Sequence, residues 1–333
     1  MVYKSLLKAA KGDVVRPTPI WFMRQAGRYL PEYRALREKY SFLEVCQTPE
    51  LAAEISLQPW RRFGVDGVIL FSDITVPAHA LGMNLSFEPG PCFESPIRIL
   101  KDVETLRRAD PKELCPSVCQ ALRLIREEVG SSATVIGFCG APWTTACYMV
   151  EGTHRPGFPT VMAMVQQNPE VLEALLEKVT SFLILYLKRQ IEAGAEVIQI
   201  FDTWAEVLSE KRYREIAFSH LQKLLDAISD EVPVILFMKN TQAFFPLLQH
   251  CHAGVISVDS KTSLIQARNT LGRVLQGNLD PERLRQGSLS EIEKTTREIL
   301  QEMSGAAHIF NLGHGILPET PLAHVHRVIE VVR

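Results

Sequence analysis

Apolar residues gather along the chain in eight short runs that are rich in β-branched and aromatic residues. We predict that these runs are β-strands, at residues 19–22, 67–71, 134–138, 196–201, 233–237, 254–258, 273–276 and 308–312. Between several of them, apolar positions recur every three or four residues, as in an amphipathic helix. This spacing predicts long helices at residues 169–193, 210–228 and 281–303.

Eight strands that alternate with helices over this length predict an α/β fold of the (β/α)8 barrel (TIM barrel) type. A doubly wound open sheet is the alternative. The sequence contains no flexible linker and no repeat of fixed period, so we expect residues 1–333 to form a single domain. Residues 79–97 are rich in glycine and proline, which predicts an irregular loop or a small hairpin after the second strand.

Polar residues follow the end of each predicted strand. In a barrel, the carboxyl ends of all the strands lie on one face, where barrel enzymes carry their active sites. The candidate residues on this face are Arg24, Arg28, Ser72, Asp73, Cys139, Gly140, Trp143, Asp202, Thr203, Lys239, Asp259, Asn278, Asp280, Asn311 and His314.

The composition limits the kinds of partner. Of the 333 residues, 46% are hydrophobic and 22% are charged, and the net charge of -2 gives no general attraction to nucleic acid. No apolar run is long enough to span a bilayer, and the first residues show no signal-peptide pattern. The seven cysteines follow no framework spacing, so we expect reduced thiols and a cytoplasmic protein.

The segment from residue 23 to residue 34 carries the most informative chemistry. Arg24 and Arg28 follow the first predicted strand, and Arg37 lies one helical turn beyond Arg34. A guanidinium is always charged and can bind a carboxylate with two parallel hydrogen bonds. The segment therefore indicates a pocket for a ligand with many carboxylates, with a solvated basic helix face as the alternative.

Three further side chains have both a functional and a structural interpretation. Asp73 is either a carboxylate at the pocket floor or a helix cap or ion-pair partner. Tyr148, in the helix expected after the glycine turn at residues 137–142, either points to the barrel mouth or packs. His314 lies between two glycines at a strand end, which favours close approach to a ligand, although a lone histidine is often structural.

The sequence offers little support for a metal or for a covalent nucleophile. Residues 250–252, His-Cys-His, resemble a ligand group, but no cysteine follows Cys251 to complete a zinc site. The chain lacks a Gly-x-Ser-x-Gly elbow. We therefore expect no zinc site of this kind and no serine nucleophile of this type.

Five segments, in order along nearly the whole chain, resemble the uroporphyrinogen decarboxylase family. They are residues 19–33 (PIWFMRQAGRYLPEY), 71–73 (FSD), 137–152 (GFCGAPWTTACYMVEG), 276–281 (QGNLDP) and 310–315 (FNLGHG). The resemblance implies a distorted (β/α)8 barrel, a homodimer, and a cofactor-free lyase of haem and chlorophyll synthesis. Such an enzyme removes the four acetate carboxyl groups of uroporphyrinogen III to give coproporphyrinogen III and carbon dioxide.

The resemblance also implies roles for particular residues. By matching position, the substrate-binding set is Arg24, Arg28, Arg37, Asp73, Tyr148, Thr203 and His314, and the catalytic set is Asp73, Arg24, Tyr148 and His314. Asp73 would accept pyrrole N–H groups and stabilise the cation that forms when a pyrrole carbon is protonated.

The chain departs from the family's usual pattern at residues 153–157, 205–206, 239–240 and 260. These positions lie near the expected barrel mouth, so they bear on the shape of the substrate loops more than on the reaction. Two other functions stay open. One is a zinc-dependent corrinoid or thiol methyltransferase of the same superfamily, and the other is a non-catalytic tetrapyrrole-binding protein.

Overall fold

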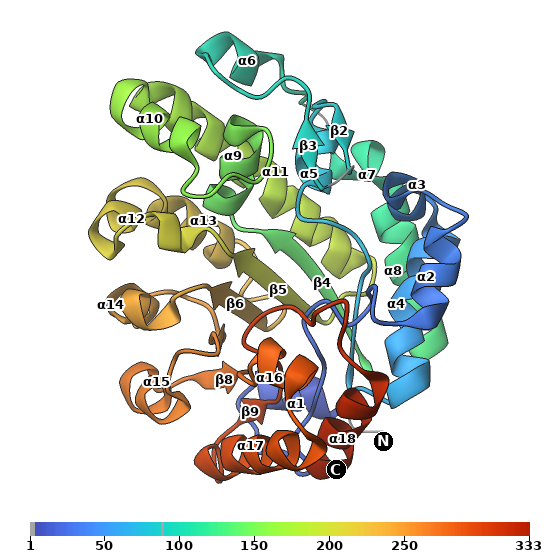
Figure 1. Cartoon of the computed structure of the whole chain (residues 1–333). Helices are drawn as coiled ribbons and strands as arrows, with labels where there is room; N and C mark the ends of the chain where they lie inside the picture. The colour runs from blue at the N-terminus through green and yellow to red at the C-terminus, as the bar shows by residue number, and fades with distance from the viewer. Residues whose placement is uncertain (1–3, 88–89, 109) are drawn as a thin grey trace.

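A curled parallel sheet of seven strands forms the centre of the computed structural model, which describes residues 4–87, 90–108 and 110–333. The strand order is β1-β4-β5-β6-β7-β8-β9 (Figure 1). The strands are β1 (Gly67–Ile69), β4 (Thr134–Gly140), β5 (Val197–Asp202), β6 (Val234–Met238), β7 (Val255–Ser257), β8 (Val274–Gln276) and β9 (His308–Ile309). A separate antiparallel pair joins β2 (Leu85–Ser86) to β3 (Cys92–Phe93).

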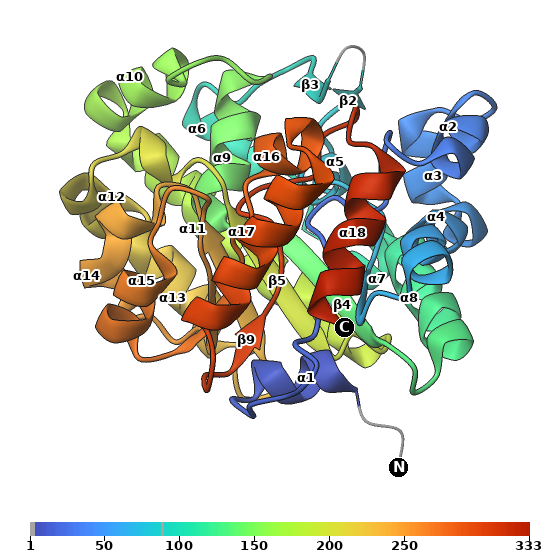
Figure 2. The same ribbon diagram turned by 60° about the horizontal axis from the view of Figure 1, so that its bottom comes forward.

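Helices surround the sheet on its outer side (Figures 1 and 2). In the first half of the chain they are α1 (Ser5–Ala10), α2 (Pro31–Arg37), α3 (Phe42–Gln47), α4 (Pro49–Phe63), α5 (Val76–Ala80), α6 (Leu100–Thr105), α7 (Pro111–Leu114), α8 (Pro116–Val129), α9 (Pro142–Glu151) and α10 (Pro159–Gln167). In the second half they are α11 (Pro169–Glu192), η1 (Ala205–Val207), α12 (Glu210–Ile216), α13 (Phe218–Asp226), η2 (Thr241–Phe244), α14 (Phe245–Leu248), α15 (Leu264–Leu271), α16 (Pro281–Gln286), α17 (Leu289–Glu302) and α18 (Leu322–Val332).

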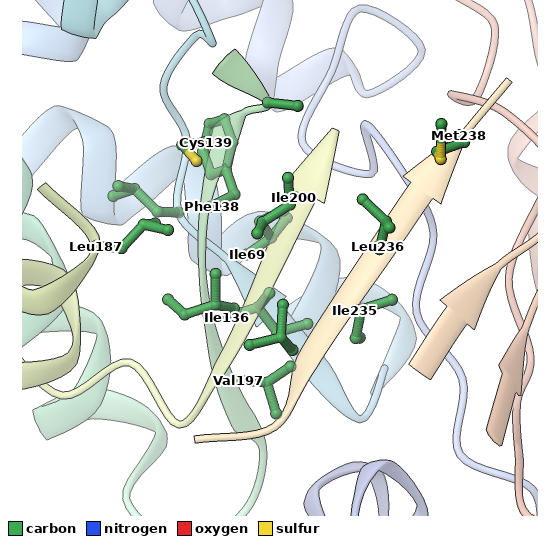
Figure 3. Packing of buried hydrophobic residues seen from close by; sticks show 14 of the residues in the cluster. Ile69, Ile136, Phe138, Cys139, Leu187, Val197, Ile200, Ile235, Leu236 and Met238 are labelled. Atoms are coloured by element: carbon green, nitrogen blue, oxygen red, sulfur yellow. The ribbon is translucent and has the colours of Figure 1, made fainter. Parts of the chain in front are cut away.

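The central strands are apolar on both faces. Residues of β4 and β6 are buried along their whole length, as expected for parallel strands that are covered on both sides. Figure 3 shows Ile136, Ile200 and Leu236, from three successive strands, packed together. This continuous apolar core explains why short, uniformly hydrophobic runs predicted these strands.

The first predicted strand, residues 19–22, is not a strand. The structure shows only an isolated parallel bridge between Ile20 and Phe310. The Ile20 amide donates to the Asp66 carboxylate over 2.8 Å, so a side chain takes the place of a ladder hydrogen bond. The same carboxylate accepts from the Ser5 hydroxyl and forms an ion pair with Arg333. The described sheet is therefore a half-barrel that is closed only by isolated contacts through residues 19–22.

A buried polar network crosses the interior of the sheet. The Trp21 indole donates to Gln276 over 2.8 Å, and the Gln276 amide donates to Gln199 and to Ser257 over 3.1 and 3.0 Å. All four side chains are completely buried. Because buried polar groups are costly unless they are paired, this network ties residue 21 to three strands and fixes their register.

The helix predictions were correct in part. Residues 169–193 form the long helix α11, as predicted. Residues 210–228 and 281–303 each form two helices, broken at Ala217 and at Gly287–Ser288. The β2–β3 pair confirms the predicted hairpin within 79–97, where residues 88–89 lie outside the described part, although α5 extends into its start. Among the described residues, no helix is long and apolar enough to cross a membrane.

Candidate active site

The turn at residues 22–25 is held by contacts from distant parts of the chain. The Met23 amide donates to the Asn311 side chain and the Met23 carbonyl accepts from the Ile316 amide, both over 2.8 Å. Gln25 accepts from the Phe22 amide and donates to the Gly67 carbonyl over 3.0 and 2.9 Å. These bonds hold Arg24 in a left-handed conformation, with φ of 61°. Such strain in a non-glycine residue persists where the surroundings impose it, often at functional sites.

Arg24 lies against Gly315, in the segment that follows β9. A Cβ atom at Gly315 would lie 2.4 Å from Arg24 Cδ, so any larger residue here would force the Arg24 side chain to move. His314, the neighbouring residue, is half-buried with its ring 5.8 Å from that of Phe237. Burial, together with the charges of Arg24 and Lys239, lowers the pKa of His314 to about 4. The imidazole is therefore neutral at pH 7 and can both donate and accept a hydrogen bond.

Asp73 follows β1 and is half-buried. Its Oδ1 atom accepts from the Thr75 amide over 2.8 Å and from the Thr75 hydroxyl over 2.6 Å, at the start of α5. These bonds close a turn before α5, whose N-terminus has no side-chain cap, so they do not make Asp73 the cap of this helix. No ion pair forms at this carboxylate within the described residues. One oxygen anchors the loop, which leaves the rest of the carboxylate as an acceptor for a ligand.

Tyr148 lies in α9, which begins with Pro142 directly after β4, as the sequence indicated. Its ring contacts Phe158 and Trp204, each with centroids 6.1 Å apart. Burial raises the pKa of Tyr148, and the Asp73 charge raises it further. Arg24 lies close enough to act in the opposite direction. The phenol therefore stays protonated at neutral pH, near both Asp73 and Arg24.

The other two predicted arginines lie beside α2. Arg28 is exposed just before the helix, and Arg37 is its last residue. The Arg37 guanidinium lies 5.5 Å from the centre of the Phe42 ring and donates to the Tyr40 carbonyl. Within the described residues, none of Arg24, Arg28 and Arg37 forms an ion pair. The three predicted arginines thus have no carboxylate partner among the described residues.

Thr203 is half-buried and directly follows β5. Its neighbour Asp202 is buried and joins β5 to two other elements through hydrogen bonds. Asp202 accepts from the Thr144 hydroxyl over 2.6 Å and from the Tyr213 hydroxyl. Burial raises the pKa of Asp202 to about 6. Sequence reasoning placed Asp202 at a strand end but missed this buried cluster, because Tyr213 comes from a different helix, α12.

The described residues contain no group of three or more His, Cys, Asp or Glu side chains that could hold a metal ion. The side chains of residues 250–252, His-Cys-His, do not form such a group. His252 pairs with Asp226, and Cys251 is buried with its thiol directed to the Leu248 carbonyl.

Comparison with known proteins places the chain in a family. Residues 2–333 match the model of the family described as uroporphyrinogen decarboxylase (URO-D). A curated uroporphyrinogen decarboxylase from Trichlorobacter lovleyi is 46% identical over 330 residues, which is 98% of this chain and 97% of that protein. One from Synechococcus sp. is 42% identical, over 98% of this chain and 92% of that protein.

Among solved structures, a methyltransferase from Methanosarcina mazei superimposes with a TM-score of 0.83 at 26% identity. The match covers 98% of this chain and 97% of that one. Sequence identity is much higher to the decarboxylases, and the family model spans almost the whole chain. The chain therefore belongs to the uroporphyrinogen decarboxylase family.

Proposed function

We propose that this protein is a uroporphyrinogen decarboxylase, which converts uroporphyrinogen III to coproporphyrinogen III and carbon dioxide. The observation that carries the proposal is the set of Arg24, Arg28 and Arg37, none of which has an ion-pair partner within the described residues. A substrate with eight carboxylates supplies the partners that these guanidiniums lack.

The reaction needs a place for electrons as the carboxyl carbon leaves. Protonation of a pyrrole carbon makes the ring a cation, and the bond between the acetate methylene and its carboxylate then breaks. The electron pair moves into the ring as carbon dioxide leaves, and a proton then adds to the methylene carbon to give a methyl group. The ring carbon finally loses the proton that it first gained, which restores the neutral pyrrole. Because the pyrrole ring is the electron sink, this scheme uses neither a metal nor an organic cofactor.

Asp73 suits the electrostatic part of this scheme. A carboxylate already fixed by Thr75 accepts pyrrole N–H groups and stabilises the cationic ring without reorganising. His314 and Tyr148 are neutral at pH 7 and serve to position the substrate, together with Thr203. We assign proton donation to Arg24 or to a carboxyl group of the substrate.

The finer architecture forms part of the same proposal. We propose that residues 19–22 act as the eighth stave of a distorted (β/α)8 barrel, supported by the Ile20–Phe310 bridge and the Trp21–Gln276 bond. The single domain is supported by one continuous cluster of buried apolar residues. We further propose a homodimer in the cytoplasm.

A second candidate function, methyl transfer, is favoured by the similarity to the Methanosarcina mazei structure. Zinc-dependent methyl transfer to a corrinoid or a thiol would require a metal site. Elemental analysis of the purified protein tests it, because stoichiometric zinc would support methyl transfer over decarboxylation.

The deciding experiment is anaerobic incubation with uroporphyrinogen III, followed by oxidation and chromatography of the porphyrins. We expect products with seven, six, five and then four carboxyl groups to appear in turn. Folded protein that gives no product from fresh substrate would contradict the proposed function.

A further inference from the structure

A second group of side chains comes from α9 and from the segments that follow α9, β5 and β6. We call it the lysine wall, defined as Tyr148, His154, Trp204, Glu206 and Lys239. Trp204 is its centre. The His154 ring stacks on the Trp204 ring with centroids 4.8 Å apart and an interplanar angle of 28°. Tyr148 meets the same indole edge-on, so the wall is continuous with a predicted site residue.

Lys239 is the cation of this wall. It follows β6 directly, so it lies at the carboxyl edge of the sheet. Its Nζ atom lies 5.8 Å from the centre of the Trp204 ring and 2.5 Å from Glu206 Oε1. The Lys239 and Glu206 side chains are 40% and 30% exposed. Both partners of the ion pair are therefore open to solvent and to a ligand.

The backbone that carries Glu206 is held firmly. The Trp204 amide donates to the Thr144 hydroxyl over 3.1 Å, and the Trp204 carbonyl accepts from the Trp143 indole over 2.9 Å. Thr144 is in turn fixed by the buried Asp202 carboxylate. Glu206 lies two residues later, in the short helix η1. The buried cluster thus presents the Glu206 carboxylate at the Lys239 ammonium.

Lys239 also lies within electrostatic reach of the predicted site. Its charge lowers the pKa of His314, as the charge of Arg24 also does. His314 thus lies within electrostatic reach of one cation without an ion pair, Arg24, and of one with an ion pair, Lys239. This arrangement makes Lys239 a fourth cation that a polycarboxylate in the site can reach.

We propose that Lys239 binds a carboxylate of the substrate. In the free protein the Glu206 carboxylate pairs with the Lys239 ammonium, so a substrate carboxylate must displace Glu206. The inference rests on the proposed function, because it takes the ligand to be a polycarboxylate. Glu206 then sets how strongly the site favours ligands with many carboxylates, since it competes only at this fourth cation.

The test is the binding of stable porphyrins, measured by their fluorescence, to the full-length protein and its variants. The probes are uroporphyrin, with eight carboxylates, and coproporphyrin, with four. We expect Glu206→Gln to bind uroporphyrin about two- to fivefold more tightly, and Lys239→Gln to bind it more weakly by a similar factor. Coproporphyrin binding should change less in both variants.

A double variant and a matched control separate this role from others. In the Lys239→Gln background, Glu206→Gln should improve binding by less than about twofold, because no ammonium is left to release. Glu298→Gln removes one negative charge from an exposed ion pair on α17 and should leave binding unchanged. Thermal melting of each variant shows that it is folded.

Three results would overturn the inference. Glu206→Gln could weaken binding as Lys239→Gln does, which would make the pair a structural element. It could leave binding unchanged, or it could strengthen binding equally with and without Lys239. Turnover of uroporphyrinogen by the unaltered protein tests the proposed function separately, because the porphyrin binding series needs no turnover.

Discussion

The two sides of the site hold their positive charge in different ways. The three arginines at positions 24, 28 and 37 have no ion pair within the described residues, whereas Lys239 has Glu206 at 2.5 Å. Cations that lack an internal anion repel one another until a ligand arrives. A paired cation adds little to that repulsion and binds a ligand only by exchange. We therefore propose that the arginines supply affinity for the substrate and that the lysine wall adjusts selectivity among ligands.

The largest expected effect is at Asp73, the carboxylate that we propose stabilises the cationic ring. Asp73→Asn keeps the oxygen that accepts from Thr75, so the fold should be retained. It removes the negative charge that stabilises a cationic pyrrole, and we expect kcat to fall at least about 100-fold, or about 3 kcal/mol. Steady-state rates with uroporphyrinogen III measure this, and turnover at the unaltered rate would remove Asp73 from the mechanism.

A smaller effect should separate free from paired arginines. Arg37→Ala removes a cation that has no ion pair, and we expect KM to rise about tenfold. Arg297→Ala removes a cation already paired with Glu293 on α17, and KM should stay within about twofold. Equal KM values for the two variants would contradict the idea that unpaired guanidiniums supply the affinity.

The close contact of Gly315 with Arg24 offers a test without a charge change. A Cβ atom at position 315 must displace the Arg24 side chain, so Gly315→Ala should lower kcat/KM about fivefold to tenfold. Gly254→Ala is the control, since a Cβ atom there has no other atom within 4 Å. If both variants keep full activity, the position of Arg24 is not important for the reaction.

The smallest expected effect is a change in the pKa of His314, which an NMR titration measures. Arg24→Gln should raise the pKa of His314 more than Lys239→Gln does, because Arg24 has the larger influence and Glu206 offsets the lysine. The unfolded histidine binds its proton near pH 6.5 and the folded one near pH 4. The folded state therefore loses stability as pH falls through this window. The reverse order of the two variants would show that the two sides do not differ in free charge.

Much of the fold could be predicted from apolar runs, because strands covered on both faces are uniformly hydrophobic. Residues 19–22 were predicted as a strand but do not form one. The Ile20 amide donates to the Asp66 side chain, and no local sequence pattern reveals such a long-range bond. The break before α17 was predictable in hindsight. Ser288 and Glu291 form a capping box whose Ser-x-x-Glu spacing is visible in the sequence.

The site could be predicted only to the level of strand ends. Arg24, Asp73, Tyr148 and His314 were expected near one face, and their mutual electrostatic influence agrees with that placement. Their catalytic roles remain predictions. The contact of Glu206 with Lys239 depends on how the loops after β5 and β6 approach each other. The sequence shows that both positions depart from the family's usual pattern, but it does not reveal that their side chains form an ion pair.

The bond from Met23 to Asn311 has a consequence for the synthesis of the protein. The two residues are 288 positions apart, so Arg24 leaves the ribosome long before the group that orients it. At about 5–20 residues per second, the delay is about 15–60 s. During that time the arginine segment of the nascent chain lacks its final partner. The arginine side of the site can thus be assembled only when translation is nearly complete, and a chain that stops before residue 311 carries the arginines without the site.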